Sequence, residues 1–100
     1  MIAVLLADDH AVVRTGFKLL LETAPDVRVV GEAESGETCI ALFDALRPDV
    51  VVLDLSMPGM GGLEALKRLK ARAKDVRILA LSAHDDSMHA RRALRQGALG

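Results

Sequence analysis

The sequence predicts a single α/β domain built on a doubly wound parallel sheet, and three observations support this. The chain has 100 residues, the size of one domain, and 51% of them are hydrophobic. It contains four short apolar runs rich in β-branched residues, none of which alternates polar with apolar positions. That pattern is typical of strands buried on both faces of a parallel sheet. Stretches with helical spacing separate the runs, and such alternation implies parallel strands joined by right-handed crossovers.

The predicted strands are the four apolar runs, at residues 2–7, 27–30, 50–53 and 76–81. A fifth strand is expected to begin at residues 98–100, where the given sequence ends. We therefore interpret residues 1–100 as one domain that is incomplete at its C-terminus.

The predicted helices lie between the strands and are marked by apolar stripes at helical spacing. The first ends before Pro25, and the second starts from Ser35 as its N-cap and stops before Pro48. A fourth helix, at residues 86–96, ends at Gly97. The stripes of the first three are Val13, Phe17, Leu20, Leu21 and Ala24; then Ile40, Phe43 and Leu46; then Leu63, Leu66, Leu69 and Ala73.

Composition limits the classes of function. The formal net charge is −1, so this segment has no basic excess with which to hold nucleic-acid phosphates. The single cysteine, Cys39, forms no disulfide within the chain and fits a reducing compartment. The apolar start lacks a positive leader, and no apolar run reaches the roughly 20 residues needed to span a bilayer. We expect a cytoplasmic protein that does not contact a membrane.

Polar side chains follow three of the predicted strands. Asp8 and Asp9 come directly after the first strand, Asp54 after the third and Ser82 after the fourth. Parallel strands place their C-terminal ends at one edge of the sheet, where ligands bind in open α/β folds. We therefore expect these four side chains to converge on a single site.

Carboxylates gathered at one edge repel one another, because two unit charges about 4 Å apart cost about 4 kcal/mol at an effective dielectric near 20. A hard oxygen-ligand cluster of this kind suits Mg²⁺, which retains waters and accepts phosphoryl oxygens. A carboxylate beside the ion is also a candidate covalent phosphoryl acceptor. The simpler alternative is that each Asp is a turn or helix-capping residue and that the Gly-rich loop at 56–62 is an ordinary connection.

Four motifs in register resemble the receiver domain of bacterial two-component response regulators. They are Ala-Asp-Asp-His at 7–10, Leu-Asp-Leu-Ser-Met-Pro-Gly-Met-Gly-Gly at 53–62, Leu-Ser-Ala-His at 81–84 and Gln-Gly-Ala-Leu-Gly at 96–100. The Asp-Asp-His opening is most similar to the subgroup fused to a LuxR-type helix-turn-helix domain. The resemblance implies a flavodoxin-like sheet with strand order 2-1-3-4-5, of which the fifth strand and last helix are missing here.

The resemblance also assigns roles to residues. It implies that Asp54 accepts a phosphoryl group from a sensor histidine kinase and that Ser82 is the hydroxyl that senses it. It implies that Mg²⁺ is held by Asp8, Asp9, Asp54 and the backbone carbonyl of Ser56, with Asp9 a more direct ligand than Asp8. Such a domain is a signalling module, not an enzyme, although it catalyses its own phosphorylation and dephosphorylation. DNA would be bound only by a C-terminal domain outside this chain, and a homodimer is left open.

The family's lysine falls after Gly100, and Lys67, Lys70 and Lys74 are predicted to lie on the third helix. Its absence predicts slower phosphorylation and leaves an alternative open: an interaction or dimerisation module that works without phosphorylation. A Mg²⁺-dependent phosphohydrolase with an aspartyl nucleophile is a third hypothesis. Those enzymes carry a second Asp two residues after the nucleophile, where this chain has Ser56. His10 is interpreted as bordering the site, not as part of it.

Overall fold

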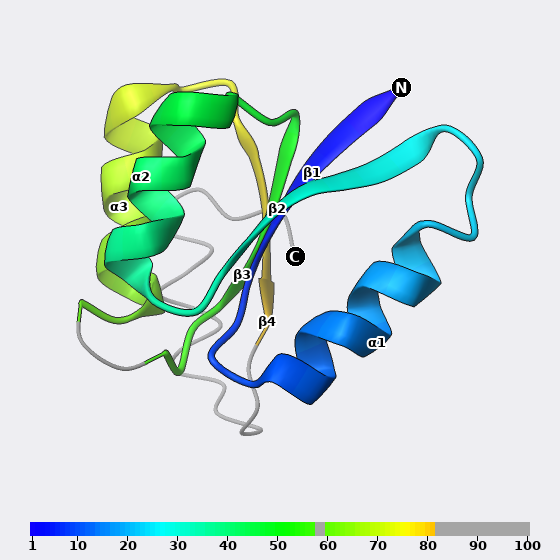
Figure 1. Cartoon of the computed structure of the whole chain (residues 1–100). Helices are drawn as coiled ribbons and strands as arrows, with labels where there is room; N and C mark the ends of the chain where they lie inside the picture. The colour runs from blue at the N-terminus through cyan, green and yellow to red at the C-terminus, as the bar shows by residue number, and fades with distance from the viewer. Residues whose placement is uncertain (58–59, 82–100) are drawn as a thin grey trace.

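A computed structural model describes residues 1–57 and 60–81 as a parallel sheet with helices on both faces (Figure 1). The elements, in chain order, are β1 (Ile2–Ala7), α1 (Ala11–Leu21), β2 (Val27–Ala33), α2 (Gly36–Leu46), β3 (Val50–Asp54), α3 (Gly62–Arg72) and β4 (Arg77–Leu81). The strand order is β2-β1-β3-β4 and every pair is parallel, which confirms the predicted doubly wound arrangement. The fourth helix and fifth strand predicted from the sequence fall outside the described residues.

The strand bounds differ slightly from the prediction. β2 continues to Ala33, beyond the predicted end at residue 30, because Gly31, Glu32 and Ala33 still pair with β1. The polar residue Glu32 fits at the end of β2 because this strand lies at the margin of the sheet and, among the described strands, pairs only with β1. β3 includes Asp54, and β4 starts at Arg77.

The larger core lies between the sheet and the helix pair α2 and α3, which pack side by side on one face (Figure 1). The apolar stripes predicted for both helices supply it: Phe43, Leu66 and Leu69 are almost fully buried. They contact strand residues such as Leu5 and Ile78, which have no exposed surface. Burial of this face therefore fixes the positions of β1, β3 and β4 relative to one another.

The other face carries a smaller core, covered by α1 (Figure 1). Phe17 and Leu21 of the predicted stripe pack on Val4, Leu6 and Val52 of the sheet. The remaining part of the stripe is open: Leu20 keeps 66% of its surface exposed. The reason is that α1 packs against β1 and β2 and reaches no other helix in the described part of the chain.

The helix ends follow local chemistry. Ser35 is the N-cap of α2 as predicted, and its hydroxyl accepts a hydrogen bond from the Thr38 amide at 3.2 Å. Arg47 adopts a left-handed conformation with φ of 46° and ends the helix before Pro48. The N-cap of α1 is His10, so neither Asp8 nor Asp9 has the capping role of the simpler alternative. None of the helices in residues 1–57 and 60–81 has the length and apolar character needed to cross a lipid bilayer.

Candidate functional site

The predicted edge of the sheet carries three carboxylates. β1 ends at Ala7, so Asp8 and Asp9 leave its C-terminal end, and Asp54 is the last residue of β3. Ala7 pairs with Leu53, which brings these ends together because β1 and β3 are neighbours. Ser82 follows directly after β4 in the sequence but lies outside the described residues.

Backbone hydrogen bonds extend the sheet into the site. The amide of Asp8 donates to the carbonyl oxygen of Ala33 at 2.9 Å, one position past the end of β1. The amide of Leu55 likewise donates to the carbonyl oxygen of Leu81 at 2.8 Å, one position past β3. Both acidic loops are therefore held by neighbouring strands at the point where they leave the sheet.

Asp54 is buried, with 2% of its surface exposed, and its two carboxylate oxygens differ. Oδ1 accepts hydrogen bonds from the amide of Ser56 at 3.0 Å and from the Ser56 hydroxyl at 2.8 Å. Oδ2 is buried and has no hydrogen-bond partner among the described residues. A buried charged oxygen without a partner is costly, so it marks a position for a ligand or for a cation.

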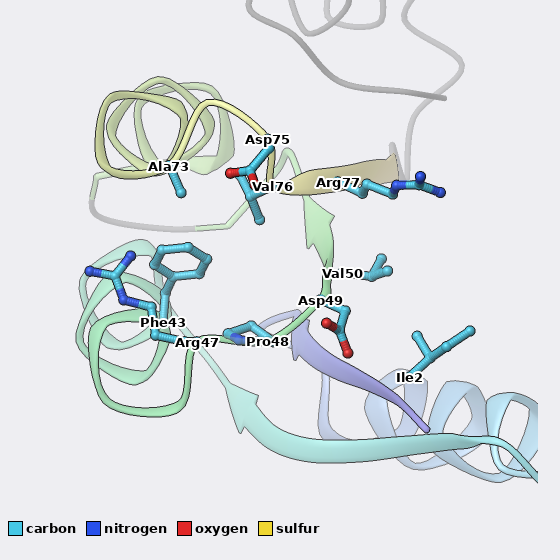
Figure 2. A pocket seen from close by; sticks show the side chains of 10 residues that line it. All are labelled: Ile2, Phe43, Arg47, Pro48, Asp49, Val50, Ala73, Asp75, Val76 and Arg77. Carbon is cyan, nitrogen blue, oxygen red and sulfur yellow. The ribbon is translucent and has the colours of Figure 1, made fainter.

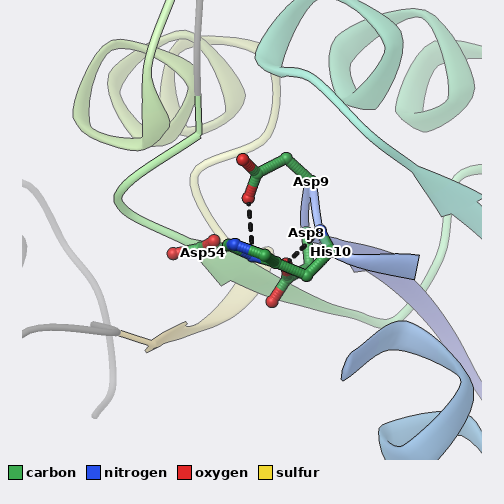
Figure 3. A group of neighbouring side chains, drawn as sticks. All are labelled: Asp8, Asp9, His10 and Asp54. Atoms are coloured by element: carbon green, nitrogen blue, oxygen red, sulfur yellow. Dashed lines mark hydrogen bonds and ion pairs between the residues drawn. The ribbon is translucent and has the colours of Figure 1, made fainter. Parts of the chain in front are cut away.

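His10 lies inside the cluster, contrary to its interpretation as a bordering residue (Figure 3). Its ring Nδ1 is 3.0 Å from Asp8 Oδ1 and 3.0 Å from Asp9 Oδ1. Only the contact with Asp8 has hydrogen-bond geometry, so Asp9 Oδ1 has no hydrogen-bond partner within residues 1–57 and 60–81. The hydrogen bond with Asp8, and then the charge of Asp9, raise the pKa of His10 above its usual 6.5. The sequence signal for the place of His10 in the cluster is its position directly after Asp8 and Asp9.

Asp8 and Asp9 are held differently. Asp8 is 4% exposed. Its Oδ1 accepts a hydrogen bond from the His10 amide at 2.7 Å and is also hydrogen-bonded to the His10 ring nitrogen. Its carbonyl oxygen accepts a hydrogen bond from Arg14 Nη1 at 2.6 Å, and Arg14 also pairs with Glu32. The Asp9 side chain is 27% exposed, and the described residues offer it no comparable restraint. Asp8 thus shapes the loop, while Asp9 Oδ1 contacts His10 without a hydrogen bond and has no hydrogen-bond partner in the described part of the chain.

The four side chains form one candidate metal cluster. Ligand atoms of Asp8, Asp9, His10 and Asp54 all lie within 4.8 Å of one another (Figure 3). The donor set fits a hard divalent ion, because two of its carboxylate oxygens have no hydrogen-bond partner among the residues that the structure describes. Three of the residues predicted for the site, Asp8, Asp9 and Asp54, are therefore brought together with His10, and Ser82 falls outside the described residues.

A separate hollow lies at the opposite edge of the sheet (Figure 2). Its volume is about 590 Å³, and Figure 2 shows lining side chains from the N-terminal ends of the strands, including Ile2, Val50 and Arg77. Its lining carries charged side chains of both signs. One of them, the guanidinium of Arg47, stacks over the Phe43 ring, 5.2 Å from the ring centroid. Lys70 of α3 also faces this edge, since its Nζ donates to the carbonyl oxygen of Val76. The hollow is therefore not part of the acidic cluster.

The fold and the acidic edge define a signalling receiver module. The family model for the response regulator receiver domain matches residues 4–100. The chain belongs to the response regulator receiver domain family.

Individual relatives agree with this assignment. The chain is 46% identical over 97 residues to the nitrate/nitrite response regulator protein NarL of Escherichia coli K12, covering 97% of this chain and 45% of NarL. A crystal structure of a LuxR-family two-component response regulator from Aurantimonas sp. SI85-9A1 superposes with a TM-score of 0.93 at 37% identity, covering 98% of this chain and 70% of that one.

An isolated receiver domain of RcsB from Salmonella enterica serovar Typhimurium, studied with the phosphomimetic BeF₃⁻, has a TM-score of 0.89 at 30% identity. That match covers 97% of this chain and 72% of the RcsB domain. The chain spans about half the length of the curated relatives it matches.

Proposed function

We propose that Asp54 is the phosphoryl acceptor of this receiver domain and that the acidic cluster binds Mg²⁺. The observation that carries the proposal is the Oδ2 atom of Asp54, a residue with 2% of its surface exposed, which has no hydrogen-bond partner in the described part of the chain. The neighbouring Oδ1 is fixed by Ser56, which orients the carboxylate and leaves Oδ2 as the reactive oxygen. The phosphomimetic used with the RcsB receiver supports the same chemistry in a relative.

In the reaction, Asp54 Oδ2 attacks the phosphorus atom of a phosphohistidine. The new O–P bond forms as the P–N bond breaks, and the electron pair of that bond stays on the imidazole nitrogen. A proton on the other ring nitrogen makes the departing imidazole neutral. The products are an aspartyl phosphate and a free histidine on the donor. The chain's own contribution is to position the carboxylate, which is the larger part of catalysis in phosphoryl transfer.

Asp8, Asp9, Asp54 and the backbone carbonyl of Ser56 are the proposed Mg²⁺ ligands. When bound, the ion offsets the negative charge that gathers on the phosphoryl oxygens. Asp9 fits a direct ligand because its Oδ1 has no hydrogen-bond partner among the described residues, whereas Asp8 Oδ1 accepts hydrogen bonds from His10. Ser82 is proposed to donate its hydroxyl to the phosphoryl group and so to signal its arrival.

The proposed partner that donates the phosphoryl group is a sensor histidine kinase. The proposed output is transcription, through a DNA-binding domain in the part of the relatives that this chain does not span, and the proposed compartment is the cytoplasm. An interaction module that works without phosphorylation is the second candidate.

The test is the intact mass of the purified chain after incubation with acetyl phosphate, with and without Mg²⁺. We expect a gain of one phosphoryl mass that depends on Mg²⁺ and is lost in Asp54→Asn. Asp75→Asn is the matched control, because it removes the same charge from an exposed position on the opposite edge. Circular dichroism establishes that each sample is folded. No gain in a folded wild-type sample would favour the interaction module, and a gain that survives Asp54→Asn would exclude Asp54 as the acceptor.

A further inference from the structure

Arg14 of α1 reaches the backbone of the acidic loop. Its Nη1 atom donates to the carbonyl oxygen of Asp8 at 2.6 Å, and its side chain is only 17% exposed. That oxygen and the amide of Asp9 belong to the same planar peptide group. A charge-assisted hydrogen bond to the oxygen therefore holds the plane from which the chain continues into Asp9.

The peptide group on the other side of Asp8 is held as well. The Asp8 amide donates to the carbonyl oxygen of Ala33 at 2.9 Å, at the end of β2. Both peptide groups that flank Asp8 are thus anchored, one by the sheet and one by Arg14. The backbone conformation of Asp8 decides where the next residue lies, so the direction of Asp9 depends on both contacts.

Glu32 and the first turn of α1 fix the guanidinium itself. Arg14 Nε lies 3.4 Å from Glu32 Oε1, so two nitrogens of one rigid fork serve the strand and the loop. The Arg14 amide donates to the carbonyl oxygen of His10 at 3.0 Å, which holds the backbone of Arg14 in the helix. The ion pair is partly exposed and contributes little to stability, so its main consequence is the direction that it gives the guanidinium.

Asp9 is the residue whose direction this arrangement decides. Its side chain is 27% exposed, and its Oδ1 accepts no hydrogen bond from residues 1–57 and 60–81. One of its carboxylate oxygens nevertheless lies within 4.8 Å of oxygens of Asp8 and Asp54 (Figure 3). Since no hydrogen bond from the described residues holds Oδ1, the backbone supplies the restraint that keeps this carboxylate in the site.

We propose that Arg14 is a positioning residue for phosphoryl transfer. By holding the Asp8 carbonyl group, it keeps the Asp9 carboxylate beside Asp54. The inference rests on the proposed function, since it concerns the same site, and it adds no ligand to that site. Arg14 acts before the ion binds, so its loss adds the cost of ordering Asp9 and weakens Mg²⁺ binding. Charge alone predicts the opposite, because removing a cation near carboxylates strengthens their attraction for Mg²⁺.

The first measurement is the Kd of the chain for Mg²⁺ by calorimetry. We expect Arg14→Ala to raise this Kd on the order of tenfold. Arg14→Lys is expected to be intermediate, because an ammonium group has no fork with which to serve the strand and the loop together. Lys18→Ala is the matched control, since it removes the same charge one turn further along α1 and should leave the Kd unchanged or lower it.

The second measurement needs no ion. Backbone ¹⁵N relaxation in EDTA gives the order parameter of the Asp9 amide, for which we expect a rigid value of about 0.85 in the wild-type chain and a clearly lower one in Arg14→Ala. The midpoint of urea unfolding is expected to stay nearly the same, whereas a merely structural role would lower it. If Arg14→Ala does not fold, Arg14→Lys carries the same two measurements, with smaller changes of the same sign.

The outcomes separate this inference from the proposed function. An Arg14→Ala chain that binds Mg²⁺ as tightly as the wild type, or more tightly, would overturn the role of Arg14, and continued phosphorylation of Asp54 would leave the proposed function standing. Weaker binding with an unchanged order parameter for Asp9 would also overturn it. A wild-type chain that neither binds Mg²⁺ nor accepts a phosphoryl group would overturn both.

Discussion

Gly62, the first residue of α3, lies directly against the backbone of Asp54. A Cβ atom on Gly62 would overlap the carbonyl oxygen of Asp54 and the Cα of Leu55, and would stand 2.9 Å from the Leu55 carbonyl carbon. These are backbone atoms of β3 and of the turn after it, so they have no side-chain rotation with which to make room. The glycine allows α3 to start close behind the proposed phosphoryl acceptor.

Gly62→Ala is therefore expected to be strongly destabilising. The methyl group forces either α3 or the Asp54 strand to move, and overpacking of this kind costs about 1–3 kcal/mol. We expect a lower midpoint of urea unfolding and, in the protein that remains folded, less phosphorylation by acetyl phosphate, because Asp54 is displaced. Equilibrium unfolding followed by circular dichroism measures the first effect and intact mass the second.

Gly16→Ala is the matched control for that substitution. Gly16 lies inside α1, and a Cβ at its position would meet no atom of residues 1–57 and 60–81 within 4 Å. Ala is the better helix former, so this variant is expected to gain about 0.5–1 kcal/mol. Equal losses at both positions would contradict the steric explanation for Gly62.

The sequence predicted the elements of the described residues and the convergence of Asp8, Asp9 and Asp54, because both depend on local patterns. Buried parallel strands appear as unbroken apolar runs, and residues directly after such runs reach the same sheet edge. The position of the His10 ring was not predicted because it depends on side-chain rotation: one residue past Asp9, the ring turns back toward Asp8. Arg14 was missed as well, since its bond to the Asp8 carbonyl depends on where α1 crosses the sheet.

The burial of α1 was the other point that periodicity did not settle. Its stripe has helical spacing, but only Phe17 and Leu21 of the stripe pack on the sheet, while Leu20 stays open. Spacing shows that residues share a face, and tertiary packing decides how much of that face is covered. The stripes of α2 and α3 were buried more fully because these two helices pack on each other as well as on the sheet.

The larger core should dominate stability. Leu66 of α3 has no exposed surface and belongs to the cluster between the helix pair and the sheet. Leu66→Ala is expected to cost about 2–5 kcal/mol, because it removes apolar burial and leaves a cavity. Leu19→Ala on α1 is the control, since Leu19 is 68% exposed and should change stability by less than about 0.5 kcal/mol. Urea unfolding measures both, and comparable losses would argue against the arrangement of the two cores.

Cys39 should report the opening of the same core. Its thiol is buried in α2, and desolvation raises the pKa of Cys39 to about 12. The reactive thiolate is therefore scarce at neutral pH, and reagent also lacks access. We expect slow reaction with a thiol reagent in the native protein and fast reaction in urea, with a rate that rises in Leu66→Ala. Fast labelling of the folded wild-type chain would contradict the burial of Cys39.

His10 should make stability depend weakly on pH when divalent ions are removed. The Asp8 hydrogen bond and the Asp9 charge raise the pKa of His10 above 6.5 in the folded state. A raised pKa means that the folded state binds the proton more tightly, so the added stability is complete below about pH 6.5 and disappears as the pH rises through the folded pKa. The effect is small because the ring is exposed to solvent.

An NMR titration of the His10 ring protons in EDTA measures this pKa directly. We expect a midpoint above 6.5 in the wild-type chain and a lower one in Asp8→Asn, which changes the hydrogen bond that is the largest cause of the shift. Asp75→Asn, on the opposite edge of the sheet, should leave the midpoint unchanged. A wild-type midpoint at or below 6.5 would mean that the ring does not stay against Asp8 in solution.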